Sequence, residues 1–204
     1  MTDISNQLLA LSKSMNNCRA CLNEGYEIYP PAVISGLDTA EFMTIGQAPG
    51  ITEQEAGRPF NAGSGKRLFD WLGRAGIEED WFRSTQYMTS VTKCYPGRQP
   101  SGSGDRVPGR REQELCRPFL DQEIDLVDPR VIIPIGRLAI NLFYAKKMKL
   151  QEIIGTHLEV SGRWVIPLPH SSGASRWHQI EENRRLIDKA IILIREQREN
   201  YFPQ

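Results

Sequence analysis

Residues 41–68 place a short apolar run, two glycine-rich turns and a helical pattern in direct succession, and this order constrains the fold more than any other stretch. The apolar run at 42–45 is bounded by a polar flank and a glycine, which is typical of a buried strand. The chain then turns through 46–50, and a second turn at 63–65 precedes apolar residues at helical spacing. A strand, a glycine turn and a helix in this order expose backbone N–H groups at the mouth of a parallel sheet, where ligands bind.

The second half of this stretch carries side chains suited to a nucleobase. Phe60 offers a flat aromatic face, and Asn61 beside it offers an amide that both donates and accepts hydrogen bonds. Proteins stack on a base with an aromatic ring and read its edge with polar groups, and a carboxamide matches the donor–acceptor edge of uracil. The glycine spacing excludes a dinucleotide fingerprint and a P-loop, but it leaves an ordinary strand-to-helix connection open.

Strand patterns and helical patterns alternate along the rest of the chain. We expect further strands at 87–93, 131–136 and 164–168, and helices at 4–15, 111–127, 137–144 and 183–195. Strands that alternate with helices form a parallel sheet with helices on both faces. We therefore predict an α/β fold, a three-layer α/β/α sandwich around a central, mainly parallel four-stranded sheet. At 204 residues the chain is expected to be a single domain, 1–204, that begins with a helix and a metal-binding segment.

The four cysteines form a two-plus-one-plus-one set. Cys18 and Cys21 can reach one metal from a single turn, whereas Cys94 follows a predicted strand and Cys116 lies on a predicted helix. The N-terminus lacks the features of a signal peptide, and no apolar run approaches membrane-spanning length, so we expect a cytoplasmic protein with no membrane partner. In a reducing compartment four cysteines are more plausible as metal ligands than as disulfides, and an iron–sulfur cluster and a zinc ion both stay open.

Charge is balanced along the chain. The 25 basic and 25 acidic residues give a formal net charge of zero, which argues against tight non-specific binding of nucleic acid but leaves a local basic patch open. The segment 97–109 is dense in Gly, Pro and Ser, which predicts a mobile surface loop. Because it contains Arg98 and Arg106, this loop is either a solvated linker or a phosphate-contacting loop.

The run G-Q-A-P-G-x-x-E-x-x-x-G-x-P-F at 46–60 resembles the first motif of the uracil-DNA glycosylase superfamily and is most similar to that of its iron–sulfur family 4. The segments K-C-Y-P at 93–96 and C-R-P-F-L at 116–120 are similar to two cysteine segments of that family. The resemblance, which covers nearly the whole chain, implies a monomeric, monofunctional DNA glycosylase of base excision repair. Such an enzyme hydrolyses the N-glycosidic bond of a flipped-out deaminated base in damaged DNA, and uracil is the base we expect. The resemblance also implies a 4Fe-4S cluster, with zinc as the alternative, on Cys18, Cys21, Cys94 and Cys116.

Residues 169–177, P-H-S-S-G-A-S-R-W, follow the last predicted strand and resemble the second motif of the superfamily. By this resemblance, the imidazole of His170 hydrogen-bonds the base carbonyl while negative charge develops there. The small residues after it enter the minor groove and push the nucleotide out of the helix, as chemistry on a base requires. The full set of residues that we expect to contact DNA is Gly50, Lys93, Ser172, Gly173, Ser175 and Arg176.

The first motif departs from the family pattern at two adjacent positions. Gln47 stands where family 4 has a glutamate, and Ala48 stands where other branches have Asp or Asn. Gln47 can hydrogen-bond the attacking water but cannot take its proton, which is tolerable if cleavage passes through an oxocarbenium-like state. Glu53, which is in register with the family, is a substitute carboxylate. We expect Gln47 and His170 to be catalytic, and Gly46, Ala48 and Glu53 to contact the substrate.

A further departure lies at Ser90, where the relatives carry an asparagine that reads uracil. We hypothesise that the reading amide, and a catalytic role with it, has moved to Asn61. The shorter Ser90 would then relax selectivity or admit a different deaminated base. The glycosylase interpretation requires Phe60 and His170 to face one cavity. The alternatives are a non-catalytic iron–sulfur DNA-binding protein of the same fold and a zinc-containing α/β hydrolase that acts on free nucleotides.

Overall fold

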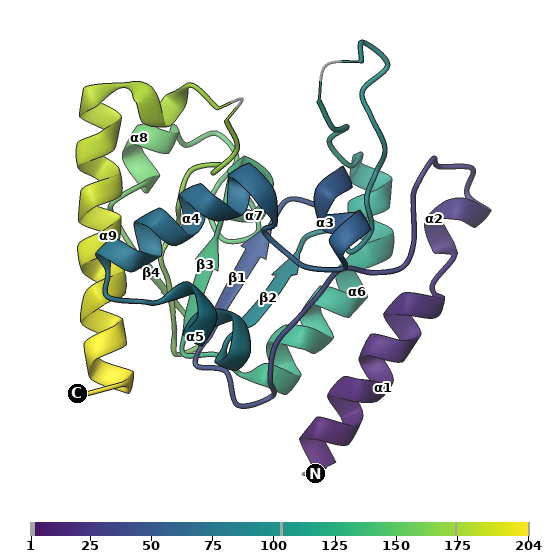
Figure 1. Cartoon of the computed structure of the whole chain (residues 1–204), viewed down its shortest axis with the longest axis horizontal. Coiled ribbons are helices and arrows are strands. Elements are labelled where there is room, and N and C mark those ends of the chain that lie inside the picture. Colours follow the sequence, from purple (N-terminus) through teal and green to yellow (C-terminus); the bar gives the residue numbers. More distant parts are fainter. Residues whose placement is uncertain (1–2, 103, 174, 204) are drawn as a thin grey trace.

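The computed structural model describes residues 3–102, 104–173 and 175–203, which fold around a five-stranded sheet (Figure 1). The strands are β1 (Phe42–Gly46), β2 (Tyr87–Ser90), β3 (Val131–Pro134), β4 (Leu158–Val160) and β5 (Arg163–Val165). Their order in the sheet is β2-β1-β3-β5-β4. β1 pairs in parallel with β2 and β3, and β3 pairs in parallel with β5, whereas β4 pairs with β5 in the antiparallel direction. The prediction of a mainly parallel sheet is therefore confirmed.

The number of strands differs from the prediction of four, because the sheet has an additional edge strand, β4. β4 is three residues long and none of its residues is buried, so it lacks the apolar run that would indicate a strand. It is joined to β5 by a tight turn in which Ser161 and Gly162 have φ of 53° and 77°. Positive φ at both turn positions matches the twist of a two-residue hairpin.

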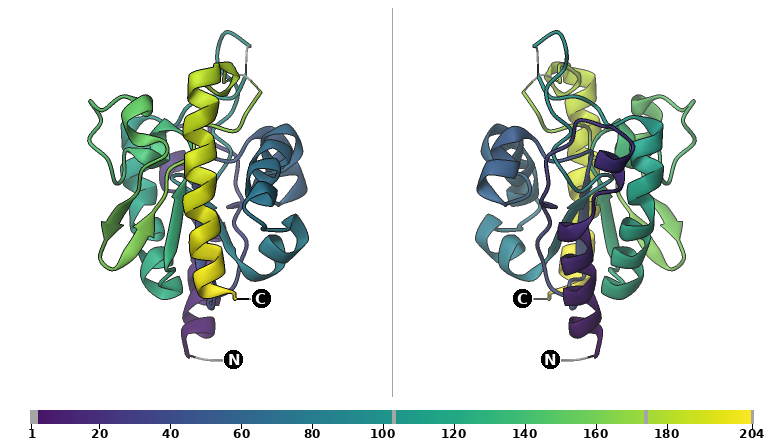
Figure 2. Two further views of the ribbon diagram at one scale, coloured as in Figure 1. Left: turned by 90° about the vertical axis from the view of Figure 1, so that its left-hand side faces the viewer. Right: turned by 90° about the vertical axis from the view of Figure 1, so that its right-hand side faces the viewer.

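Helices cover both faces of the sheet. They are α1 (Asp3–Asn17), α2 (Ala20–Asn23), α3 (Ile51–Ala56), α4 (Ala62–Arg74), α5 (Glu79–Thr85), α6 (Arg110–Val127), α7 (Arg137–Ile140), α8 (Leu150–Ile153) and α9 (Glu181–Tyr201), with a 3-10 turn η1 (Trp177–Gln179). Figure 2 shows α4 and α5 on one side of the sheet and α6 on the other, as a three-layer sandwich requires. The helix predicted at 137–144 is shorter and ends as α7 at Ile140. Across the described ranges, no helix combines the length and the apolar character needed to cross a membrane.

The helices meet the sheet through apolar faces, with one exception. Every residue of β1 and β3 is buried, as expected for central strands covered on both sides. The buried face of α6 includes Leu120 and Val127, but also the carboxylates of Glu112 and Glu123. A carboxylate is buried only at a large cost unless it is paired and hydrogen-bonded. The two buried carboxylates of α6 therefore need cationic partners.

The carboxyl ends of the parallel strands meet at one edge of the sheet. Gly46 at the end of β1 is in register with Ser90 at the end of β2. β3 continues into Ile135, which forms a parallel bridge with Leu168 beyond β5. The glycine turn after Gly46, the loop after Ser90 and the segment after Leu168 are therefore brought together at this edge, where open α/β sheets bind ligands.

Candidate active site

A cavity of about 60 Å³ lies at the carboxyl edge of the sheet. The sequence-predicted residues that line it are Gly46, Gln47, Ala48, Glu53, Phe60, Ser90 and His170. Phe60 and His170 therefore face the same cavity, which is the condition that the glycosylase interpretation requires. We call this cavity the base cavity. Its lining combines an aromatic ring with hydroxyl, amide, carboxylate and imidazole groups. A planar polar ligand needs this mixture of an apolar face and convergent polar groups.

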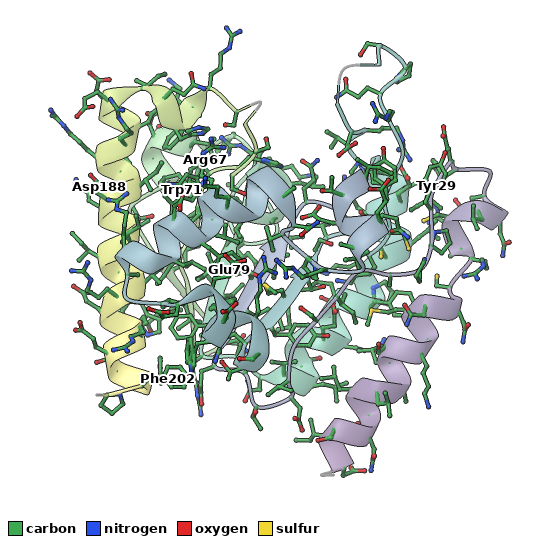
Figure 3. The ribbon with its side chains drawn as sticks, in the orientation of Figure 1. Tyr29, Arg67, Trp71, Glu79, Asp188 and Phe202 are labelled. Atoms are coloured by element: carbon green, nitrogen blue, oxygen red, sulfur yellow. The ribbon has the colours of Figure 1, made fainter. Side chains whose placement is uncertain are left out.

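The ring of Phe60 is presented from an unusual backbone conformation. Phe60 has a φ of 50°, a region that residues with a Cβ seldom occupy. The guanidinium of Arg83 on α5 donates to the carbonyls of Pro59 at 2.9 Å and Phe60 at 2.8 Å. Arg83 is itself held by Glu79 at 2.7 Å, whose position on α5 is labelled in Figure 3. We missed Arg83 from the sequence, where only its spacing of four residues from Glu79 marks it.

Two glycines allow the approach of Phe60. A Cβ at Gly65 would lie 1.7 Å from the carbonyl oxygen of Phe60, so no other residue fits at that position of α4. A Cβ at Gly46 would lie 3.1 Å from Cζ of the Phe60 ring. The glycine that ends β1 thus leaves the room in which the ring packs against the sheet edge. The turn predicted at 63–65 is wrong, because these residues form the first turn of α4. Gly46 and Gly65 both leave room for Phe60.

His170 is neutral and its tautomer follows from one contact. Its Nδ1 accepts a hydrogen bond from the backbone N–H of Ser172 at 3.1 Å. Burial lowers the pKa of His170 below its ordinary value, which favours the uncharged ring. A neutral imidazole with Nδ1 as acceptor carries its proton on Nε2. The group available to a ligand in the base cavity is therefore the Nε2–H donor.

Gly136 makes room for His170. It follows β3 with φ 83° and ψ 164°, a conformation adopted almost only by glycine. A Cβ at this position would lie 2.8 Å from Cδ2 of His170. Gly136 falls within the predicted strand at 131–136, where its role could not be recognised. It is thus a further residue that the sequence reasoning missed.

Glu53 lies in the wall of the base cavity and is occupied by backbone donors. Its carboxylate accepts the N–H groups of Gly50, Phe60 and Asn61. Burial, and secondarily the charge of Asp105, raise the pKa of Glu53, while these three hydrogen bonds oppose the rise. Glu53 therefore fixes the turn that carries Phe60, in addition to facing the cavity.

Gln47 and Ser90 lie at the ends of paired strands. The backbone of the loop after β2 returns to the first motif, because Val91 N–H donates to Gly46 O at 3.0 Å and Thr92 N–H to Gln47 O at 3.3 Å. The hydroxyl of Ser90 donates to Thr92 O at 2.7 Å. Since that proton is used, the Ser90 oxygen can only accept a hydrogen bond from a ligand.

The structure contradicts the prediction that Asn61 reads the base. Asn61 is the N-cap residue of α4, and its Nδ2 donates to Thr52 O at 3.2 Å. Its side chain is not part of the cavity lining. The sequence could not reveal this, because the positive φ of Phe60 turns the following residue toward α3.

The structure also contradicts the prediction that Lys93 contacts DNA. Its side chain is 2% exposed, and its Nζ lies 2.5 Å from the carboxylate of Glu123 on α6. A buried ammonium cannot reach a phosphate on the surface. The expected strand 87–93 ends at Ser90, and the chain then turns, which directs Lys93 into the interior.

The remaining predicted DNA contacts differ in availability. The backbone N–H of Gly50 already donates to Glu53, so it is not free for a phosphate. Gly173 and Arg176 are exposed and Ser172 and Ser175 are half-buried, whereas Ala174, which the predicted wedge also includes, lies outside the described residues. Their segment is anchored because Arg67, labelled on α4 in Figure 3, donates to Ser171 O at 2.8 Å.

Arg106, one of two arginines in the Gly/Pro/Ser-rich loop, mostly contacts other residues of the protein. Arg106 pairs with Glu112 at 2.6 Å and donates to the carbonyls of Pro96 and Glu27, both at 2.9 Å. Arg106 therefore holds the two ends of the loop together and provides the cationic partner of the buried Glu112. The phosphate-contacting interpretation of the loop loses this residue, whereas Arg98 is exposed.

A second cavity, of about 30 Å³, is lined by all four cysteines, Cys18, Cys21, Cys94 and Cys116. We call it the cysteine cavity. Burial raises the pKa of the Cys21 thiol to about 11 and that of Cys94 to about 12, and burial also raises the pKa of Cys116. The charges of neighbouring cysteines raise these pKa values further. The thiols are therefore close to one another and need a positively charged partner to be ionised.

The donor set fits an iron–sulfur cluster. Four cysteine sulfurs from three separate segments around one hollow are the ligands that a [4Fe–4S] cluster takes. Among the described residues, no group of three or more His, Cys, Asp or Glu is arranged to hold a single metal ion. The four cysteines nevertheless line one cavity.

Comparison with known proteins agrees with this geometry. The family profile described as "Uracil DNA glycosylase superfamily" matches residues 33–193. The chain is 30% identical to the type-4 uracil-DNA glycosylase of Thermotoga maritima over 182 residues, 87% of each protein. It is 31% identical to that of Archaeoglobus fulgidus over 180 residues, 83% of the chain and 84% of the relative. It is 38% identical to that of Pyrobaculum aerophilum over 120 residues, 59% of the chain and 53% of the relative. The chain therefore belongs to the uracil-DNA glycosylase superfamily, and within it to the type-4 family.

Proposed function

We propose that this chain is a monofunctional uracil-DNA glycosylase of base excision repair, which hydrolyses the N-glycosidic bond of a flipped-out uracil. The observation that carries this proposal is the shared cavity of Phe60 and His170 at the carboxyl edge of the sheet. The names of the relatives from Thermotoga maritima and Archaeoglobus fulgidus support it.

The base is bound after it leaves the duplex. Extrusion costs about a few kcal/mol, which contacts with the displaced base and with the gap must offset. Phe60 provides the stacking face, and Arg83 and Glu53 hold the backbone that presents it. Ser172, Gly173, Ser175 and Arg176 are the residues we assign to the gap in the DNA.

The chemical step depends on charge stabilisation. As the glycosidic bond breaks, its electron pair passes to the base, and negative charge develops on the base carbonyl. The Nε2–H of neutral His170 donates to that oxygen, and one such donor contributes about 10²–10³ in rate. Gln47 orients the water that adds to the sugar carbon, and the proton of that water passes to solvent. A strong base is not required, because the oxocarbenium-like state is itself electrophilic.

Discrimination between uracil and cytosine follows from Ser90. Since the Ser90 hydroxyl donates to Thr92, its oxygen presents only lone pairs to the cavity. Uracil presents an N–H on this edge, whereas cytosine presents a lone pair that the oxygen repels. Hypoxanthine and xanthine present the same N–H, and we propose that they are weaker substrates.

We propose that Cys18, Cys21, Cys94 and Cys116 hold a 4Fe-4S cluster rather than zinc. When bound, the cluster supplies a covalent link among the N-terminal segment, the loop after β2 and α6, and it takes no part in the bond cleavage. Iron and sulfide analysis tests this directly. The colour of the purified protein is a second test, because an iron–sulfur protein is brown and a zinc protein is colourless. We also propose that the chain is a single domain that acts as a cytoplasmic monomer; sedimentation and limited proteolysis test the monomer and the domain.

The experiment that tests the function is excision from oligonucleotides. Duplexes carrying uracil, hypoxanthine, xanthine or a thymine mismatch are incubated with the protein and then treated with alkali, which cleaves abasic sites. We expect cleavage at uracil that is slowed about 10²–10³-fold in a His170→Ala variant. A gel shift on uracil DNA without any abasic product would instead identify a non-catalytic binder, for which the missing carboxylate at Gln47 is the argument.

A further inference from the structure

A buried ion pair lies between the base cavity and the cysteine cavity. Lys93 lies in the loop after β2, and Glu123 lies on α6, with side chains 2% and 0% exposed. Their charged groups are 2.5 Å apart. Glu123 also accepts the hydroxyls of Tyr87 at 3.1 Å and Thr89 at 3.0 Å. Every group of the pair is therefore in contact with strand β2.

The same lysine reaches both cavities. Its Nζ donates to Thr89 Oγ1 at 2.7 Å and to Ser90 O at 2.6 Å, and both residues line the base cavity. Lys93 itself lines the cysteine cavity next to Cys94, and its backbone N–H donates to the Cys116 sulfur. Lys93 therefore joins the end of β2 to two of the four cysteine positions.

Stability alone does not account for such a pair. Replacing a buried ion pair by well-packed apolar side chains is often neutral or stabilising, because desolvation offsets the attraction. An apolar pair, however, cannot donate hydrogen bonds to the Ser90 carbonyl and the Thr89 hydroxyl, as Lys93 does. Ser90, which lines the base cavity, is attached to the backbone carbonyl that Lys93 holds.

We propose that Lys93, paired with Glu123, is a positioning residue of the base cavity, which ties the Thr89–Ser90 end of β2 to the cysteine site. The inference rests on the proposed function, since it concerns the cavity in which the base is held. It replaces the predicted phosphate contact of Lys93 by an internal role.

The test uses a charge-neutral double variant, Lys93→Met with Glu123→Gln. The amide introduced at position 123 can still bond Tyr87 and Thr89, so no buried charge is left unpaired, whereas the bond to Ser90 O is removed. We expect single-turnover excision of uracil to slow by about tenfold or more. The preference for duplex with 2′-fluoro-2′-deoxyuridine, whose glycosidic bond resists hydrolysis, over thymidine duplex should fall by a similar factor. The affinity for undamaged duplex and its salt dependence should stay within twofold of the wild type.

A matched control is Arg106→Met with Glu112→Gln, which removes another ion pair of α6 that lies outside the base cavity. This control should lower the Tm and leave the excision rate and the uracil preference unchanged. The inference is overturned if the Lys93 and Glu123 variant keeps the wild-type rate and preference. It is also overturned if the slope of log K against log salt falls by about one, as the loss of a phosphate contact would cause. A wild-type protein that prefers the fluorinated duplex but releases no base would refute the proposed activity alone, and the preference ratio would still decide the role of Lys93. A wild type with no preference at all would refute both.

Discussion

Replacing Gly136 by alanine should displace the imidazole of His170, which lines the base cavity. The new Cβ would lie 2.8 Å from Cδ2 of His170, well inside a carbon–carbon contact, and the φ of 83° with ψ of 164° is strained for alanine. The backbone strain costs about 1–3 kcal/mol, which lowers the Tm of a chain of this size by roughly 2–12 °C. Relief of the clash requires His170 to move. The rate should then fall by up to about 10²–10³-fold, the contribution of one donor to the developing oxyanion.

The assay is single-turnover excision of uracil from a duplex, measured well below the Tm of the variant. Gly76→Ala is the matched control, because Gly76 also has positive φ, at 78°, but a Cβ there would meet no atom within 4 Å. This control should lose stability and keep its rate. If Gly136 acts through the imidazole, Gly136→Ala should change the rate by less than about twofold when His170 is already alanine.

Two results would refute this reasoning. One is a Gly136→Ala protein that is less stable but excises uracil at the wild-type rate, which would mean that His170 can move without loss. The other is an equal loss of rate with and without the imidazole, which would mean that Gly136 acts on another part of the cavity.

The remaining predictions concern other parts of the site. Arg83→Met removes both bonds that hold the Phe60 backbone, and we expect the KM for uracil duplex to rise about tenfold while DNA affinity without uracil is unchanged. Burial lowers the pKa of His170, so the folded protein binds fewer protons there than the unfolded chain; stability from this residue is complete above the ordinary histidine pKa of about 6.5 and is lost as the pH falls through the lowered value. Thermal unfolding of a His170→Asn variant should therefore be less sensitive to acid. Ser90→Asn should narrow the cavity and reduce hypoxanthine excision at least about tenfold relative to uracil, as competition between the two substrates would show. Removal of the proposed cluster by an iron chelator should lower the Tm and expose the N-terminal segment to protease, because the cysteine cavity joins this segment to α6.

Local patterns were sufficient for the fold class. The apolar runs that became β1 and β3 are buried on both faces, and such runs indicate central strands whatever their partners are. β4 was missed because an edge strand needs no apolar pattern, and its existence depends on the turn that pairs it with β5. The early end of β2 at Ser90 likewise depends on Lys93, which turns inward to meet a carboxylate from another element.

For the site, the sequence alone determined which chemical groups the protein has and which segments carry them: the aromatic Phe60 after a glycine turn, His170 after the last strand, and four cysteines in one set. These follow from order and spacing along the chain. Only the tertiary structure decided where the side chains point. Asn61 bonds Thr52 instead of a base, Lys93 is buried against Glu123, and Gly136 and Arg83 support the two walls of the base cavity. The physical reason is that a side chain takes its direction from backbone dihedrals and from partners on other elements, and the spacing of neighbouring residues determines neither.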